Sequence, residues 1–535
     1  MLVVVGGDLN WFFLAFRVGL FKCSSTIAAA HTGVVTSLIP AFVRDLVLLL
    51  PVNSLSCTFP SAEGSGMNMF KTRHRRYGRA TMLAAGAAAM IQVAAVGFAA
   101  ACPCASDDYV PIQPALTPPA MPAEDQVFLN PPRDVVAAKQ PGEIIAAREV
   151  HPAFQSIIQP DVDAWQLSYR SNNSRDEPIA AVTTVMKPRG KAPTNLVSVQ
   201  IPEDAVAAHC APSYTSQLLA LPPNYAGTMG PNFMLPMALY AVTKGWAVSI
   251  PDHEGLLSAF AAGPLAGRIT LDGIRATENF KPMELKQGRD TKVGLWGDSG
   301  GSVPTMHAAE QRATYAPDVN LVGTVSGSNV ADVRDLIDYQ NSSFVAGTVF
   351  AGMVGVSREY PELQTYLDQH MNPLGQGLRS VHSNVCQGWS VFSFPALNIK
   401  GLFDSPDFTR EPANQHVLDQ VRMGNATPDR PVYIFQSMGD WIMPAYATDR
   451  LVDNYCQNDG QITYRRIQIG ESYSQAFLSV PGTYQWLQER FDGVPIGAGC
   501  NRQDVVAIAK DDSPEMNEWV SIVGPELTAA AAKPA

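Results

Sequence analysis

The stretch KVGLWGDSGG, residues 292–301, decides the fold. Its first half is a short apolar run that is typical of a buried strand. Ser299 follows at once in the pattern G-x-S-x-G, and residues 305–311 continue with a helix-compatible composition. A strand, a sharp turn and a helix around such a serine are typical of a nucleophile elbow, in which crowding of the backbone requires glycines near the serine. The stretch therefore predicts Ser299 as a nucleophile and the N–H of Gly300 as a donor to an oxyanion.

Short strand-like runs on both sides of this stretch indicate an alternating α/β chain. The predicted strands are 180–186, 196–201, 247–250, 292–296, 321–326, 432–436 and 462–469. Helical patterns lie between them, which favours a mostly parallel sheet covered by helices. Residues 106–160 are polar and rich in proline, so we expect little regular structure there.

The alternation is interrupted from about 330 to 427, where apolar residues cluster between Phe344 and Met353. We interpret this span as an inserted helical cap. The alternative is an ordinary run of scaffold helices. Residues 524–535 have the composition of a frayed tail.

The amino-terminal part of the chain indicates export. No apolar run in residues 1–66 reaches the roughly 20 uninterrupted residues that a bilayer span needs. Residues 67–101 join a basic segment to an alanine-rich apolar stretch that ends in three alanines, which is typical of a secretory signal peptide. We therefore expect translation to begin at Met67 or Met69 and the secreted domain to span residues 102–535.

Two alternatives to this interpretation follow from the same residues. Residues 1–66 would be a membrane-anchored leader if the chain truly begins at Met1. Cys102, directly after the three alanines, would carry a lipid anchor, although the leucine that usually precedes such a cysteine is missing.

Net charge, motifs and cysteine spacing argue against several classes of function. The 535 residues carry a formal net charge of −11, and no Lys/Arg stripe is present, which argues against nucleic-acid binding. The sequence has no metal, nucleotide or flavin motif, so we predict no cofactor. Four cysteines in the body lack CxxC spacing, which argues against zinc, and they allow three disulfide pairings.

Several separate motifs resemble a known family. These are CAPSY at 210–214, PDHEG at 251–255, LDGIRA at 271–276 and GDSGG at 297–301, in the same order as in the secretory lipase family of α/β-hydrolases. The resemblance covers roughly residues 125–495. It implies an α/β-hydrolase core with an inserted helical lid, acting on acylglycerols or other carboxylic esters.

The resemblance also assigns roles to individual residues. Ser299 matches the nucleophile, and Asp440 matches the acid of the catalytic triad. Asp440 follows the predicted strand 432–436, where the chain order Ser, Asp, His requires it. Asp204 matches the residue that completes the oxyanion hole with Gly300. We favour two disulfides, which the resemblance also implies: Cys210 with Cys386, and Cys456 with Cys500.

The triad histidine is missing from this chain. Family members carry it after the last predicted strand, where this sequence reads GESYSQAF at 470–477. Tyr473 is the best match for the vacant position, and Ser472 is the second. Since His416 is the last histidine of the chain, a Ser–His–Asp triad in the usual order cannot form. Tyrosine, with a pKa near ~10, is protonated at neutral pH and is no substitute base.

Other histidines are weak candidates for that role. His253 follows a predicted strand, but it belongs to the PDHEG motif, which favours a structural role. His307 lies eight residues after Ser299. On a helix this separation is about 12 Å along the axis, too far for a base. His370, His382 and His416 lie in or near the expected cap and have no supporting motif.

Two functions follow from these residues. The first is a secreted lipase or carboxylesterase that forms an acyl-enzyme at Ser299, contacts a lipid interface transiently and lacks its usual base. The second is a catalytically inactive scaffold that binds lipid or acyl ligands. Neither function involves nucleic acid, and the sequence does not determine the oligomeric state.

Overall fold

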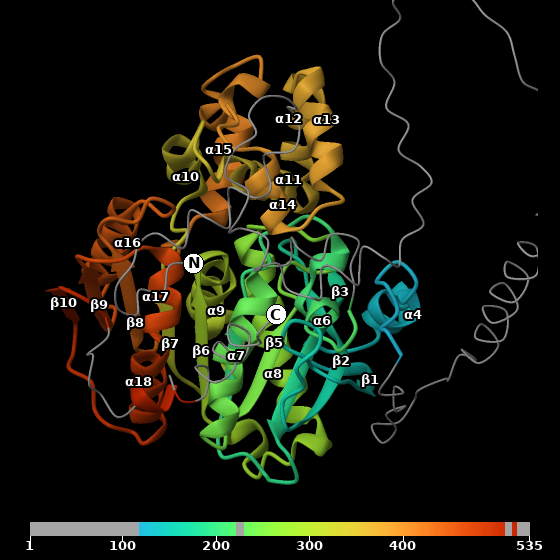
Figure 1. Ribbon diagram of the computed structural model, residues 1–535, viewed down its shortest axis with the longest axis vertical. Coiled ribbons are helices and arrows are strands. Elements are labelled where there is room, and N and C mark those ends of the chain that lie inside the picture. Colours follow the sequence, from blue (N-terminus) through green and yellow to red (C-terminus); the bar gives the residue numbers. More distant parts are fainter. Residues whose placement is uncertain (1–116, 221–228, 509–515, 520, 522–535) are drawn as a thin grey trace, which may run out of the picture. The chain divides into compact units, whose positions relative to one another are not determined.

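A ten-stranded sheet forms the centre of the molecule (Figure 1). The computed structural model describes residues 117–220, 229–508, 516–519 and 521. The strand order is β1-β2-β3-β5-β4-β6-β7-β8-β9-β10. The strands are β1 (Ile144–Glu149), β2 (Val162–Asn172), β3 (Pro178–Pro188), β4 (Leu196–Gln200), β5 (Ala247–Pro251), β6 (Val293–Asp298), β7 (Leu321–Gly327), β8 (Val432–Ser437), β9 (Ile462–Ile467) and β10 (Cys500–Val505).

The sheet is mostly parallel, as the sequence predicts. The neighbouring strands in the series β5-β4-β6-β7-β8-β9-β10 pair in parallel. At the other edge of the sheet, the pairs β1–β2, β2–β3 and β3–β5 are antiparallel. The expectation of little regular structure in residues 106–160 is wrong for β1 and for two short helices, α4 (Gln126–Leu129) and α5 (Arg133–Ala137). All six residues of β1 are only half-buried, so this edge strand lacks the apolar alternation that would identify it.

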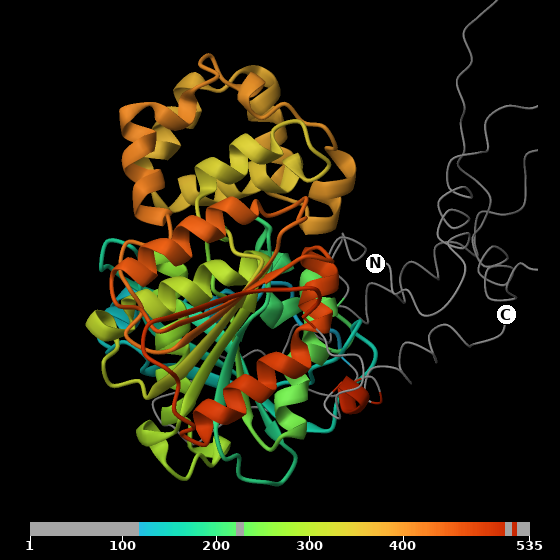
Figure 2. The same cartoon turned by 90° about the vertical axis from the view of Figure 1, so that its left-hand side faces the viewer.

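Two apolar cores lie on the two faces of the sheet. Val293 and Leu295 of β6 belong to one core, and Trp296 belongs to the other, because successive side chains of a strand point to opposite faces. Helices α8 (Gly263–Asn279), α9 (Ser302–Tyr315) and α16 (Ala445–Gln457) cover the first face. Helices α7 (Met229–Thr243) and α18 (Val480–Phe491) cover the second (Figure 2). The covered sheet holds the end of β6, and therefore Ser299, at a fixed position.

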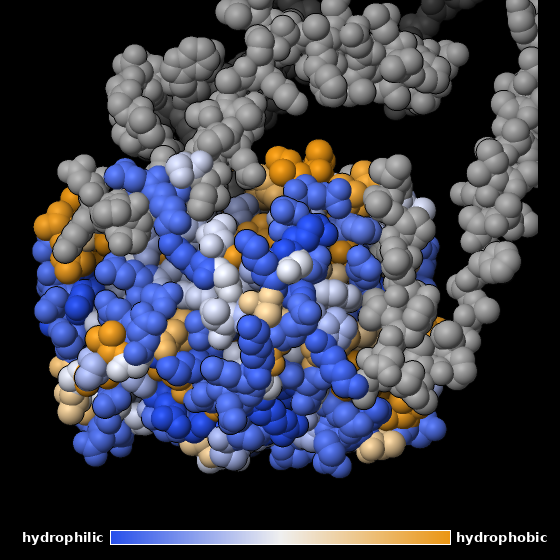
Figure 3. All heavy atoms as spheres, turned by 90° about the horizontal axis from the view of Figure 1, so that it is seen from below, coloured by the Kyte–Doolittle hydropathy of each residue, from blue (hydrophilic) through white to orange (hydrophobic). Residues whose placement is uncertain are grey.

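Six helices between β7 and β8 lie over the carboxyl ends of the strands, and we call residues 333–421 the cap (Figure 2). They are α10 (Val333–Gln340), α11 (Ala346–Glu359), α12 (Pro361–His370), α13 (Pro373–His382), α14 (Gln387–Ser393) and α15 (Pro412–Val421). Side chains of the cap reach backbone carbonyls of the core. Gln340 Nε2 donates to the carbonyl oxygen of Trp441 at 2.8 Å, and Arg358 donates to that of Leu257 at 2.7 Å. The face opposite the cap is mainly hydrophilic (Figure 3).

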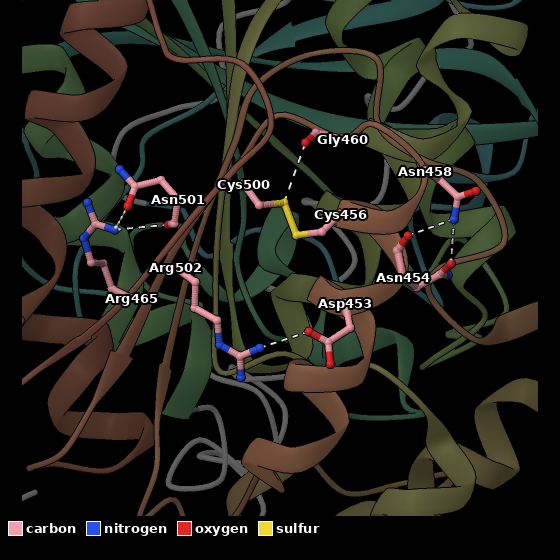
Figure 4. Close-up of a disulfide and its surroundings, with 9 residues drawn as sticks. All are labelled: Asp453, Asn454, Cys456, Asn458, Gly460, Arg465, Cys500, Asn501 and Arg502. Atoms are coloured by element: carbon pink, nitrogen blue, oxygen red, sulfur yellow. Dashed lines mark hydrogen bonds and ion pairs between the residues drawn. A yellow bond between two sulfur atoms is a disulfide. The ribbon is translucent and has the colours of Figure 1, made fainter.

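Both expected disulfides are present. The bond Cys210–Cys386, with Cα atoms 5.6 Å apart, joins the loop after β4 to the residue that precedes α14. The bond Cys456–Cys500 ties α16 to β10 (Figure 4). Beside it, Arg502 donates to Asp453 at 2.9 Å and fastens the same two elements.

Several predictions about the ends of the chain concern residues that the structure does not describe: the leader 1–66, the signal peptide 67–101 with Cys102, and the tail 524–535. Within the described part of the chain, no helix is both long and apolar enough to span a membrane.

Candidate active site

Ser299 lies in a tight turn between β6 and α9. Its φ of +56° is a left-handed conformation that non-glycine residues rarely adopt. The neighbouring backbone makes glycine necessary on both sides. A Cβ on Gly297 would lie 2.2 Å from the carbonyl oxygen of Gly301, and one on Gly301 would lie 1.9 Å from that of Gln200. This strained, glycine-enforced turn is the geometry expected of a nucleophile elbow.

Asp204 packs against Gly300, the residue that follows Ser299. It lies in the loop after β4 with a φ of +48°, and it is buried. A Cβ on Gly300 would lie 1.6 Å from Asp204 Oδ1, which has no hydrogen-bond partner, whereas Oδ2 accepts from Gln387 Nε2 at 2.6 Å. Burial raises the pKa of Asp204 to about 7. A large protonated fraction therefore exists at neutral pH and can donate a hydrogen bond beside Gly300.

Asp440 follows β8, is buried, and accepts hydrogen bonds from four donors. Its Oδ1 accepts the N–H groups of Ile442 and Met443 at 2.9 and 3.1 Å. Its Oδ2 accepts from Ser472 Oγ at 2.6 Å and from Gln436 Nε2 at 3.2 Å. Burial raises the pKa of this carboxyl, and the hydrogen bonds from Ser472 and the two amides oppose that rise. No histidine is among these partners of Asp440.

Ser472, rather than Tyr473, contacts the acid. Ser472 is the first residue of α17 (Ser472–Leu478), whose start is fixed by a capping box between Glu471 and Ser474. Tyr473 is half-exposed, and its backbone N–H donates to Glu471. Of the two residues that match the vacant position, Ser472 is the one hydrogen-bonded to Asp440.

The phenol of Tyr473 still lies near the site. Desolvation, together with the negative charges of Asp204, Glu471 and Asp440, raises its pKa to about 12. A phenol with that pKa keeps its proton at neutral pH, so it does not act as the missing base.

The other histidines considered as substitutes are engaged elsewhere. His253 Nε2 lies 2.9 Å from the carbonyl oxygen of Ile201, and His307 Nε2 lies 3.1 Å from that of Val421. Burial lowers the pKa of each to about 4. His382 contacts the carbonyl oxygen of Leu378 inside the cap. Two more are exposed there: His370 beside Asp404, and His416 on α15.

Buried acids that sequence reasoning missed surround the oxyanion side of the site. Burial and neighbouring carboxylates raise the pKa values of Glu203 and Glu254 well above their usual range. Asp298, directly before the nucleophile, is also buried, and burial together with the charge of Asp440 raises its pKa. Glu254 and Asp298 lie within the motifs PDHEG and GDSGG, but the motifs do not reveal their burial, which depends on loops that are distant in sequence.

The described residues include one cluster with metal-ligand types: His209, Cys210 and Cys386. The two sulfur atoms are bonded to each other, so neither is available as a thiolate ligand.

Comparison with known proteins shows the family of this chain. The family model "Secretory lipase" matches residues 231–499. Lipase A of Arthroderma benhamiae is 32% identical over 396 residues, covering 72% of this chain and 83% of that protein. This chain belongs to the secretory lipase family. The family implies a serine hydrolase with an ester or lipid substrate.

Other relatives carry names of both active and inactive lipases. A secreted triacylglycerol lipase of Malassezia globosa is 32% identical, covering 71% of this chain and 84% of that protein. A Mycobacterium tuberculosis protein named "probable inactive lipase" is 34% identical, covering 71% and 84%. The closed-state structure of Candida antarctica lipase A superposes with a TM-score of 0.69 and 26% identity, covering 76% of this chain and 95% of that one. The fold is therefore that of a lipase α/β-hydrolase.

Proposed function

We propose that this protein binds carboxylic esters, acylglycerols among them, at Ser299 and hydrolyses them slowly because it lacks a general base. The observation that carries the proposal is the hydrogen bond from Ser472 to Asp440 at 2.6 Å, in the position where the family has a histidine. The elbow around Ser299, the carboxyl of Asp204 and the acid Asp440 are all in place.

The lack of a base affects the step in which Ser299 loses its proton. For Ser299 Oγ to form a bond with the ester carbonyl carbon, its proton must pass to a base within hydrogen-bond reach. The Ser472 hydroxyl is too weakly basic to take that proton, and it is already a donor to Asp440. The oxyanion that forms on the carbonyl would still be stabilised by Gly300 and Asp204. An oxyanion hole with binding alone retains roughly 10³–10⁴-fold catalysis over water, against a loss of roughly 10⁶ for the base.

We further propose that the protein is exported by the signal segment 67–101, since relatives carry names of secreted lipases. Exposed aromatic side chains support transient contact with a lipid interface. They are Phe344, Trp389, Phe392, Trp441 and Tyr473.

The test of slow hydrolysis is a comparison of the purified protein with its Ser299→Ala variant on p-nitrophenyl butyrate. We expect a low rate that exceeds the rate of the variant by at least about tenfold, together with a butyryl adduct on Ser299 in the intact mass. Equal rates and no adduct would contradict hydrolysis.

A second function, ligand binding without turnover, is favoured by the same Ser472 contact. It would be supported if the protein has no rate above Ser299→Ala but binds a non-hydrolysable ether analogue of an acylglycerol saturably. Trp441 and Trp389 are exposed and supply a fluorescence signal for that titration.

A further inference from the structure

One side chain of the cap reaches the oxyanion side of the site. Gln387 is the first residue of α14, and its Nε2 donates to Asp204 Oδ2 at 2.6 Å. The two residues are 183 positions apart in the sequence. The other oxygen, Oδ1, is the one that faces Gly300, and it is buried without a partner. With Oδ2 bonded to Gln387, it is Oδ1 that lies against Gly300.

The disulfide Cys210–Cys386 holds both ends of this contact. Cys386 directly precedes Gln387, and Cys210 lies six residues after Asp204 in the loop that follows β4. Ala205, Ala207 and the two cysteines form a small apolar cluster of their own. A covalent bond therefore keeps the segment of the cap that carries the donor close to the loop of the core that carries the acceptor.

We propose that Gln387 is a positioning residue of the oxyanion hole, which orients the Asp204 carboxyl so that Oδ1 points to the developing oxyanion beside Gly300. The proposal rests on the proposed function, because it assumes that an ester carbonyl reacts at Ser299. It gives the cap a role in the chemistry as well as in covering the site.

The chemistry of the donor fits this role. A glutamine amide is neutral, so it orients the carboxyl without holding it ionised as a lysine or arginine would. Arg358 of the cap donates to the carbonyl oxygens of Val206 and Leu257 and to Ser383 Oγ rather than to Asp204. The other titratable groups that interact with Asp204 are Glu203, Glu254, Asp298 and Tyr473. Each has a raised pKa, and none of them supplies a positive charge that would hold Asp204 ionised.

The experiment measures binding of butylboronic acid, because adduct formation at equilibrium does not require the missing base. Ser299 Oγ forms a bond to boron, its proton passes to water, and the tetrahedral boronate places an oxygen in the oxyanion hole. We expect Gln387→Ala to raise the Kd by at least about tenfold. Gln376→Ala is the matched control: this cap glutamine donates to the carbonyl oxygen of Leu367, within the cap, and its loss should leave the Kd unchanged.

The pH profile separates positioning from a structural role. In the unmodified protein we expect boronate affinity to rise with pH, because adduct formation releases a proton, and to level off above about pH 7, with a midpoint set by the loss of the Asp204 proton. The Gln387 hydrogen bond lowers the pKa of Asp204, so Gln387→Ala should move this midpoint to higher pH. An unchanged Kd and an unchanged midpoint in Gln387→Ala would overturn the proposal. A purely structural role would lower the melting temperature and leave both quantities as they are.

A second measurement distinguishes failure of the proposed function from failure of the role proposed for Gln387. If Ser299→Ala binds the boronate as well as the unmodified protein, no adduct forms at Ser299 and the proposed function fails. The contact itself is then tested by infrared titration of the Asp204 carboxyl, with Asp204→Asn identifying its band. A higher midpoint in Gln387→Ala supports the positioning of Asp204, and the same midpoint in both proteins contradicts it.

Discussion

The two halves of the active site differ in completeness. The nucleophile half, around Ser299 and Asp204, has its strained turn, its required glycines and a carboxyl directed at Gly300. In the half that includes Asp440, this carboxyl accepts four hydrogen bonds, and one of them comes from Ser472 instead of an imidazole. The first half is built by backbone geometry that the whole fold enforces, whereas the second depends on the identity of one side chain. A single substitution can therefore disable the chemistry and leave the architecture intact.

The largest effect should come from restoring the base. Ser472→His places an imidazole at Asp440, and we expect kcat/KM on p-nitrophenyl butyrate to rise at least roughly 10³-fold, part of the factor that a triad histidine supplies. Tyr473→His is the matched control, since it introduces the same side chain one residue further along α17. A larger gain from Tyr473→His than from Ser472→His would show that Ser472 does not occupy the vacant position.

The acid should matter only when the base is present. In the Ser472→His background we expect Asp440→Asn to lower kcat by at least roughly 10²-fold, part of the roughly 10⁴ that an acid partner contributes in a complete triad by orienting the imidazole and stabilising its charged form. In the unmodified protein the same substitution should change the slow rate less than about threefold. A double-mutant cycle of initial rates measures this coupling, and equal effects in the two backgrounds would mean that Asp440 does not act through the imidazole.

Substituting one glycine in the elbow and one in the loop that carries Asp440 compares how tightly the backbone is packed at the two places. A Cβ on Gly301 would lie 1.9 Å from the carbonyl oxygen of Gln200, but one on Gly439, next to Asp440, would meet nothing within 4 Å. We expect Gly301→Ala to lower the free energy of unfolding by about 2 kcal/mol or more, as overpacking does. Gly439→Ala should cost less than about 0.5 kcal/mol. Urea titration followed by circular dichroism gives both values, and similar losses would contradict the contrast.

A smaller effect should appear in the pH dependence of stability. Burial raises the pKa of Asp204 from 3.8 to about 7, so the folded state binds the proton more tightly than the unfolded state. This contribution is complete below about pH 4 and is lost as the pH rises through about 7. We expect Asp204→Asn to reduce the stability difference between about pH 5 and about pH 8 by at least about 1 kcal/mol. An unchanged difference would mean that Asp204 titrates normally.

Sequence and structure agree best where local pattern determines the element. The strands β3 to β9 are predicted because each is a short apolar or β-branched run, whereas β10, with the sequence CNRQDV, is exposed and polar and gives no such signal. Ser299 and Asp440 are predicted because each follows a strand within a recognisable motif. Tyr473 is preferred over Ser472 because the sequence does not reveal where α17 begins. The capping box at Glu471 fixes that start in three dimensions.

Gln387 could not be predicted at all. Nothing in its neighbourhood marks it, and its contact with Asp204 depends on a disulfide that spans 176 residues. The disulfide itself is predicted, but the side-chain contact beside it is visible only in the folded chain.

The central claim is that this secretory lipase lacks only a base, and the most direct measurement adds one from solution to the unmodified protein. Serine is smaller than histidine, so free imidazole is expected to bind beside Asp440 and Ser299. Initial rates on p-nitrophenyl butyrate are measured against imidazole concentration, with Ser299→Ala for the uncatalysed background. We predict a saturable rise of at least about tenfold in the unmodified protein and no rise in Ser472→His. A fast rate without imidazole, unaffected by its addition, would contradict the claim and show that another base serves Ser299.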